Sequence, residues 1–189
     1  MHGENGNKEE IMQYNGKEYK VLSEKQEGNI LYLALELEEK LPEKEVESIG
    51  FKFGQRSLNS LKGIHPDLVK VMTEAIKTSP VDFTITDSLR TIEQQQALYA
   101  QGRTKAGSKV TNVDGVKVKS NHQAKSDKYG YAVDLYAFYN GAVQVNDDKT
   151  IINKLAPHIK ATAKKLGINI EWGGDWKSFK DYPHFELKK

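Results

Sequence analysis

Two stretches of this chain decide its fold: EWGGDWKSFKDYPHFELK, residues 171–188, and SNHQAKSDKYGYAVDLY, residues 120–136. Each stretch contains a short run, HFEL or YAVDLY, in which apolar and other residues alternate. A period of two is typical of a β-strand with one buried face. We therefore expect two short strands, each with polar residues among apolar ones, and work outward from them.

Each of these strands carries a polar side chain that is costly to bury. Asp134 faces away from Val133 and Leu135, and His184 faces away from Phe185, because successive side chains of a strand alternate between its faces. A buried acid or histidine requires a partner or a metal ion. The two strands are therefore candidates for the walls of a polar site.

His122 completes a set of two histidines and one carboxylate with Asp134 and His184. A catalytic zinc ion takes three protein ligands and keeps a fourth position for water, and this set suits zinc. The chain contains no cysteine, so thiolate sites and disulfides are excluded. Asp181 could take a proton from water and pass it to a leaving amine. Pro183 disfavours helix, so this acid and His184 are expected across a short bend.

Four further residues are candidates for the same site, and each has an ordinary structural alternative. Arg90 follows an expected strand, where its planar fork suits a carboxylate or a carbonyl oxygen that gains charge; the alternative is a surface ion pair. Ser120 could bind substrate or be a turn residue. Trp172 and Trp176 could line a substrate-binding cleft or pack in the core.

The body of the chain, residues 51–189, has the pattern of an α+β domain with a small antiparallel sheet packed against about three helices. His65 and Pro66 mark the start of the first helix. Residues 103–121 are polar and are expected to form a long loop. Helices are predicted over 64–79, 91–102 and 151–167, and strands over 81–87, 131–145, 168–172 and 184–187.

Residues 1–50 are expected to form a separate, small N-terminal extension. Asn15-Gly16 between two strand-like runs predicts a hairpin. The alternation in residues 30–37 favours a third strand, although their Leu, Ala and Glu content favours a helix. The extension carries a net charge of −6 and the rest of the chain +8. It could be a binding or docking module or could stabilise the body, and the basic body could attract a polyanion or be an ordinary solvated surface.

The motifs of the body resemble the zinc-dependent D-alanyl-D-alanine carboxypeptidase and L-alanyl-D-glutamate endopeptidase family, and they look closest to its phage endolysin branch. The resemblance covers about Phe51 to Leu187. It is carried by FKFGQRSLNSLKGIHPDLVKV, ITDSLRTIEQQQALYAQGRT, SNH with YGYAVDLY, and WGGDWKSFKDYPHFEL.

The resemblance implies that His122, Asp134 and His184 bind one zinc ion. It also implies that Asp181 is the general base and that Arg90 steadies the scissile carbonyl. The step from the first histidine to the aspartate is longer here than in many members, because AKSDK is inserted. This insertion leaves Asp127 as a rival ligand, and Asp134 is favoured because YAVDL matches the family context.

The activity implied by the resemblance is hydrolysis of a peptide bond in the stem of bacterial peptidoglycan. The phage-like context favours the L-alanyl-D-glutamate bond. Two alternatives stay open: a D-alanyl-D-alanine carboxypeptidase or dipeptidase, and a wall-binding module without turnover. We expect a monomer without a nucleic-acid partner, membrane span or secretion signal, made in the cytoplasm and acting on the wall after release.

Overall fold

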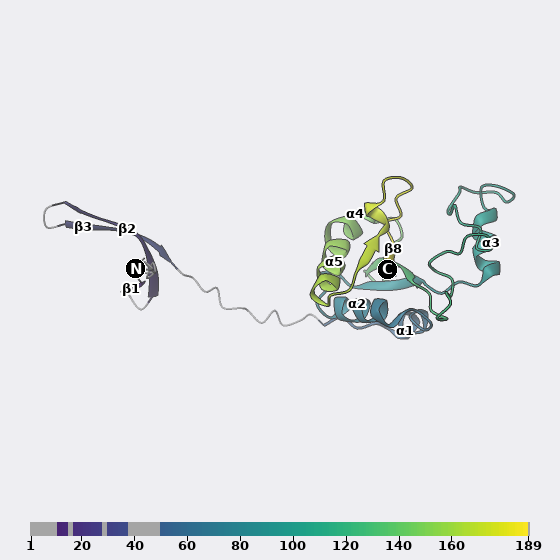
Figure 1. Ribbon diagram of the computed structural model, residues 1–189, viewed down its shortest axis with the longest axis horizontal. Coiled ribbons are helices and arrows are strands. Elements are labelled where there is room, and N and C mark those ends of the chain that lie inside the picture. The colour runs from purple at the N-terminus through teal and green to yellow at the C-terminus, as the bar shows by residue number, and fades with distance from the viewer. Residues whose placement is uncertain (1–10, 15–16, 28–29, 38–49, 189) are drawn as a thin grey trace, which may run out of the picture. The chain divides into compact units, whose positions relative to one another are not determined.

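The computed structural model describes residues 11–14, 17–27, 30–37 and 50–188 of the chain (Figure 1). The chain divides into two compact units, Met1–Val46 and Glu47–Lys189, which are described separately. Within the described residues, no helix combines the length and the apolar character needed to cross a membrane.

The first unit contains a three-stranded antiparallel sheet of β1 (Ile11–Tyr14), β2 (Lys17–Glu27) and β3 (Ile30–Leu37), in that order. The predicted strand over residues 30–37 is confirmed. Its period of two prevails over its helix propensity because β3 pairs with β2 along its whole length. The predicted turn residues 15–16 lie outside the described part of the chain.

The second unit is an α+β domain, as predicted, and its sheet is antiparallel throughout. The strand order is β4-β5-β8-β7, with the short β6 paired to β5. Its strands are β4 (Phe83–Asp87), β5 (Ala132–Tyr139), β6 (Ala142–Val143), β7 (Ile170–Trp172) and β8 (His184–Leu187).

The pairing of β5 with β8 places Asp134 directly opposite His184. Residues paired across two strands point to the same face of a sheet. The next pair in the ladder, Val133 with Phe185, therefore points to the other face, where both side chains are fully buried. One face of the sheet thus carries the core, and the opposite face carries the polar residues that the sequence singled out.

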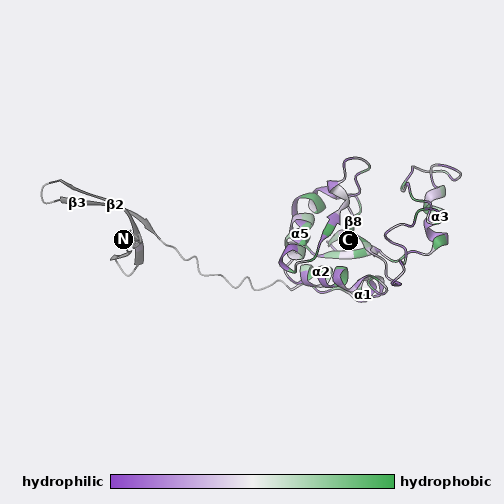
Figure 2. Cartoon of the chain, in the orientation of Figure 1, coloured by the Kyte–Doolittle hydropathy of each residue, from purple (hydrophilic) through white to green (hydrophobic). Residues whose placement is uncertain are grey.

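Helices cover the core face of the sheet. The apolar sides of α2 (Pro66–Lys77) and α5 (Ala156–Lys165) pack against each other and against the strands. Figure 2 shows apolar and polar residues alternating around these two helices, as expected when only one side of a helix is buried. The remaining helical segments are α1 (Gln55–Ser60), α3 (Ile92–Ala100), α4 (Asp148–Thr150), η1 (Ile151–Leu155) and η2 (Gly173–Asp175).

The three predicted helices are confirmed, with one local difference. The helix expected over residues 151–167 is preceded by the short α4, begins as the π-helical η1 and becomes α-helical only at Ala156. Pro157 lies in the first turn of α5, directly after the π-helical segment, and it cannot donate the backbone hydrogen bond of a regular helix there. The internal proline therefore marks the start of α5 and does not lie in the middle of a single regular helix.

Candidate metal centre

His122, Asp134 and His184 converge on one point. His122 Nε2 lies 3.1 Å from His184 Nδ1, and Asp134 Oδ1 lies 3.1 Å from His184 Nδ1 and 3.3 Å from His122 Nε2. Both imidazoles are buried, with 2% and 7% of their side-chain surface exposed. Among the described residues, no other group of three His, Asp or Glu side chains brings its potential ligand atoms together in this way.

The outer hydrogen bonds of the two imidazoles fix which nitrogens face inward. His122 Nδ1 lies 2.7 Å from the carbonyl oxygen of Ser88, which only accepts, so Nδ1 carries the proton. His184 Nε2 lies 2.9 Å from a carboxylate oxygen of Glu186, so here Nε2 carries the proton. The lone pairs of His122 Nε2 and His184 Nδ1 therefore point at each other and at Asp134 Oδ1. Three acceptors without a donor between them form a site for a cation.

The charges around His184 favour a cation at this point. Burial lowers the pKa of its imidazole, but the hydrogen bonds and negative charges of Asp134 and Glu186 outweigh burial and raise this pKa to about 9. Burial raises the pKa of the Asp134 carboxyl, and the imidazoles of His122 and His184 outweigh it and hold this pKa well below its ordinary value. A proton or a metal ion can supply the missing positive charge, and the two compete for the same lone pairs.

The second oxygen of Asp134 is held by Arg90. Arg90 Nη2 donates to Asp134 Oδ2 at 2.9 Å and lies 2.7 Å from Asp87 Oδ2, while its Nε donates to the same oxygen of Asp87 at 2.8 Å. The guanidinium side chain is only 14% exposed, so these are partly buried ion pairs. In this geometry Arg90 turns Asp134 so that Oδ1 faces the two imidazoles.

Asp181 lies in the bend before β8, as the proline predicted. Its N–H donates to the carbonyl oxygen of Gly173 at 3.2 Å, and its own carbonyl accepts from the N–H of His184 at 3.2 Å. Burial, followed by the charge of Asp134, raises the pKa of the Asp181 carboxyl, while the positive charges of the imidazoles and Arg90 oppose this shift. The carboxyl is therefore within electrostatic reach of the whole cluster.

Gly173 leaves no room for a side chain beside Asp181. A Cβ atom added to this glycine would lie 2.2 Å from the carbonyl oxygen of Asp181 and 3.1 Å from its Cβ. The backbone of the Gly173–Asp175 turn is thus in direct contact with the bend that carries the acid. Gly173 does not have a positive φ, so backbone conformation does not explain the glycine here. The close approach of the Asp181 backbone does.

The two tryptophans have different places. Trp172 belongs to the core, is 8% exposed, and donates its indole N–H to the carbonyl of Tyr182 at 2.7 Å. The ring of Trp176 lies against the imidazole of His184, with 5.0 Å between ring centroids. Only Trp176 therefore lies beside the cluster.

Ser120 and the inserted segment form turns around the first histidine. The hydroxyl of Ser120 accepts from the N–H of His122 at 3.2 Å. The carboxylate of Asp127 accepts from the Tyr131 hydroxyl at 2.5 Å and from the Tyr129 N–H at 3.3 Å, and it is not part of the converging group. The carboxylate of the insertion is thus bound to residues that follow it closely in the chain, and Asp134 supplies the carboxylate of the converging group.

The two groups that orient the histidines, Glu186 and the Ser88 carbonyl, could not be assigned from the sequence. The period of two placed Glu186 on the face of His184, but it gave no role to that carboxylate. Ser88 contributes a backbone carbonyl, for which a sequence contains no residue-specific signal.

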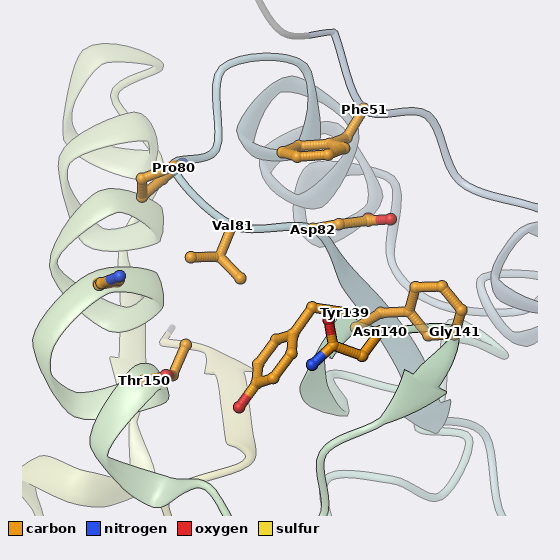
Figure 3. A pocket seen from close by; sticks show the side chains of 10 residues that line it. Phe51, Pro80, Val81, Asp82, Tyr139, Asn140, Gly141 and Thr150 are labelled. Atoms are coloured by element: carbon orange, nitrogen blue, oxygen red, sulfur yellow. The ribbon is translucent and has the colours of Figure 1, made fainter.

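A cavity of about 680 Å³ lies elsewhere in this unit, beyond the far end of β5 (Figure 3). Phe51, Phe138 and Tyr139 give it an aromatic lining, with Asp82 and Lys154 as its charged residues. His122, Asp134 and His184 do not line it, so it is distinct from the candidate metal centre.

Comparisons with known proteins agree with the motifs. The family model described as phage L-alanyl-D-glutamate peptidase matches residues 49–188. The peptidoglycan L-alanyl-D-glutamate endopeptidase CwlK of Bacillus subtilis (strain 168) is 36% identical over 138 residues, which cover 66% of this chain and 73% of the relative. The L-alanyl-D-glutamate peptidase of Escherichia phage T5 is 32% identical over 141 residues, which cover 75% of this chain and 92% of the relative.

A solved structure gives the same result. The L-Ala D-Glu endopeptidase ChiX of Serratia marcescens superposes with a TM-score of 0.56 at 32% identity, over 77% of this chain and 94% of that one. The family model spans most of the chain and includes every residue of the converging group. The resemblance predicted from the motifs is therefore confirmed, and the chain belongs to the phage L-alanyl-D-glutamate peptidase family.

Proposed function

We propose that this chain is a zinc-dependent hydrolase that cleaves the L-alanyl-D-glutamate bond in the peptide stem of bacterial peptidoglycan. The observation that carries the proposal is the convergence of two imidazole nitrogens and one carboxylate oxygen, which lie 3.1 to 3.3 Å from one another. This donor set fits zinc, because neutral imidazoles and a carboxylate are its usual catalytic ligands and leave one position open. The names of the relatives support the choice of bond.

The residues of the site divide the work of hydrolysis. His122 through Nε2, His184 through Nδ1 and Asp134 through Oδ1 would hold the zinc ion. When bound, zinc supplies Lewis acidity toward the scissile carbonyl and toward water. Asp181 takes a proton from the attacking water and gives it to the leaving amine. Its raised pKa suits this task, since a base works best with a pKa nearer the working pH.

Arg90 has a first task in holding the ligand Asp134. Its Nη2 contacts both Asp134 and Asp87, and its Nε contacts Asp87. Arg90 Nη1 donates to Gln95 Oε1 at 3.4 Å and carries a second N–H, which we assign to the contact with the scissile carbonyl that the resemblance implies. We propose that Arg90 does both: it orients the ligand in the free protein and stabilises the carbonyl oxygen during the reaction.

We also propose a division of the chain into an N-terminal extension, residues 1–50, and a peptidase domain, residues 51–189. The family match over residues 49–188 supports this boundary. The net charge of +8 on residues 51–189 suits a polyanionic bacterial wall, on which the protein would act as a monomer after release from the cytoplasm. Trp176, beside His184, is our candidate for a substrate contact.

Digestion of purified peptidoglycan followed by mass spectrometry of the fragments tests the activity. We expect new D-glutamate amino ends and stems that end in L-alanine. Release of free D-alanine would instead support a carboxypeptidase, and tight wall binding without fragments would support a module without turnover.

Two aspartate variants test whether Asp181 is the proton acceptor. Asp181→Asn removes the proton acceptor, and we expect the rate to fall by about 10²–10⁴-fold. Asp175→Asn is the matched control, because Asp175 lies in the same segment but is exposed and pairs with Lys160 at 2.6 Å. Equal activity of both variants would contradict the role given to Asp181.

A further inference from the structure

Glu186 links the two segments that carry the histidines. One oxygen of its carboxylate, Oε2, accepts from His184 Nε2 at 2.9 Å and from Asn121 Nδ2 at 2.8 Å. Asn121 is the neighbour of His122 in the chain, and its own carbonyl accepts from the N–H of Tyr131 at 2.6 Å. The carboxylate is 18% exposed, so water competes little for these bonds.

We propose that Glu186 is a positioning residue of the metal centre: it keeps the proton of His184 on Nε2 and ties His184, through Asn121, to the segment of His122. The inference rests on the proposed function, because the lone pair that this arrangement frees is the one offered to zinc. Glu186 itself is not part of the converging group.

The need for such a residue follows from the position of Asp134. Its Oδ1 lies 3.1 Å from His184 Nδ1, where it attracts a proton to the nitrogen that must bind the metal. Glu186 attracts the same proton to the opposite nitrogen at a slightly shorter distance, 2.9 Å. Without Glu186 only Asp134 accepts a proton from the neutral ring, which favours the tautomer with Nδ1–H, and that tautomer has no lone pair on Nδ1 to offer a metal.

The strand geometry makes this arrangement rigid. His184 and Glu186 are two residues apart on β8 and therefore share a face of the sheet. Glu186 pairs with Ala132 on one side and with Glu171 on the other, so its backbone is held by two neighbouring strands. Glu171 makes an ion pair with Lys188 at 3.2 Å, and no contact of it with His184 is present among the described residues.

These neighbours provide a matched set of variants. Glu186→Ala removes the acceptor, Glu186→Gln keeps a neutral acceptor of the same shape, and Asn121→Ala removes only the tie between the segments. Glu171→Gln is the control, since it changes a glutamate of the adjacent strand that is bound elsewhere.

The experiment measures zinc affinity by competition with a chromophoric chelator, and the Nε2–H signal of His184 in the zinc-loaded protein by ¹⁵N NMR. We expect zinc affinity to fall by roughly 10- to 100-fold in Glu186→Ala, less in Glu186→Gln and Asn121→Ala, and not in Glu171→Gln. The Nε2–H signal, protected from solvent exchange in the unmodified protein, should exchange rapidly in Glu186→Ala.

Three results would overturn the inference. If Glu186→Ala binds zinc as tightly as the unmodified chain and keeps a protected Nε2–H, Glu186 does not position His184, while the proposed function stands. If the unmodified chain itself fails to bind zinc, the proposed function fails and the inference with it. If Glu186→Ala does not fold, Glu186→Gln and Asn121→Ala decide, and unchanged zinc affinity in both refutes the inference.

Discussion

Replacing Gly173 by alanine should displace Asp181, which we propose as the proton acceptor, without changing any residue of the converging group. The new Cβ would lie 2.2 Å from the carbonyl oxygen of Asp181, well inside any van der Waals contact. Relief requires a shift of about 1 Å of the bend that carries Asp181, and a misplacement of this size can cost about 10²-fold in rate. Overpacking of this kind also costs typically 1–3 kcal/mol of stability.

The assay compares kcat on purified peptidoglycan, zinc content and thermal unfolding for Gly173→Ala and for the control Gly54→Ala. Gly54 has an ordinary φ of −70°, and an added Cβ meets no atom within 4 Å, so the control adds the same methyl group without a clash. We expect a folded, zinc-containing Gly173→Ala protein with a rate about 10²-fold lower. A rate within twofold of the control would refute the reasoning that this contact places Asp181.

Three further predictions concern the acid, the arginine and the core. Burial and Asp134 raise the pKa of Asp181, and the base acts in its ionised form, so activity should be lost as pH falls through a value above the ordinary 3.8. An acid limb of kcat/KM at or below pH 3.8, measured at constant zinc content, would contradict this. In Arg90→Lys, the lysine has no planar guanidinium that can bind Asp134 and Asp87 at once, so zinc affinity, measured by chelator competition, should fall about tenfold. An unchanged affinity would mean that Arg90 does not position Asp134 and acts only on the substrate. Leu135→Ala removes a fully buried side chain from β5 and should cost about 2–5 kcal/mol in denaturant unfolding, whereas a cost below 1 kcal/mol would mean that the core face is not closed there.

The sheet and its polar face could be predicted because strand alternation is a local property. The period of two in YAVDLY and HFEL fixed which side chains share a face, and the structure pairs Asp134 with His184 on that face. The helix α1 was missed because its six residues are too few to show an apolar period. The place of Trp176 could not be predicted, because it follows η2 in an irregular segment that has no period from which burial follows. Trp172 ends β7, which has only three residues, too few for strand alternation to show which face is buried.

The arrangement around His122 could not be derived from local pattern at all. Its imidazole meets β5 and β8 from a loop, and the loop is held by contacts far along the chain, such as the bond of His122 Nδ1 to the Ser88 carbonyl. Motif resemblance supplied this residue where physical periodicity could not. The same resemblance left Asp127 open as a rival; in the structure Asp127 accepts from the Tyr131 hydroxyl and lies outside the converging group.

The two histidines use different ring atoms, and this difference makes them unequal in reach. Nδ1 is the ring nitrogen nearer the main chain and Nε2 the farther one, so His184 would hold an ion close above the sheet while His122 extends toward it from the loop. Asp134 and His184 are paired across β5 and β8, whereas His122 reaches the same point from a loop. The two histidines could therefore not exchange their ring nitrogens without a change in the backbone. Asparagine, which has the shorter side-chain amide, is the closer mimic of His184. Glutamine, which has the longer one, is the closer mimic of His122.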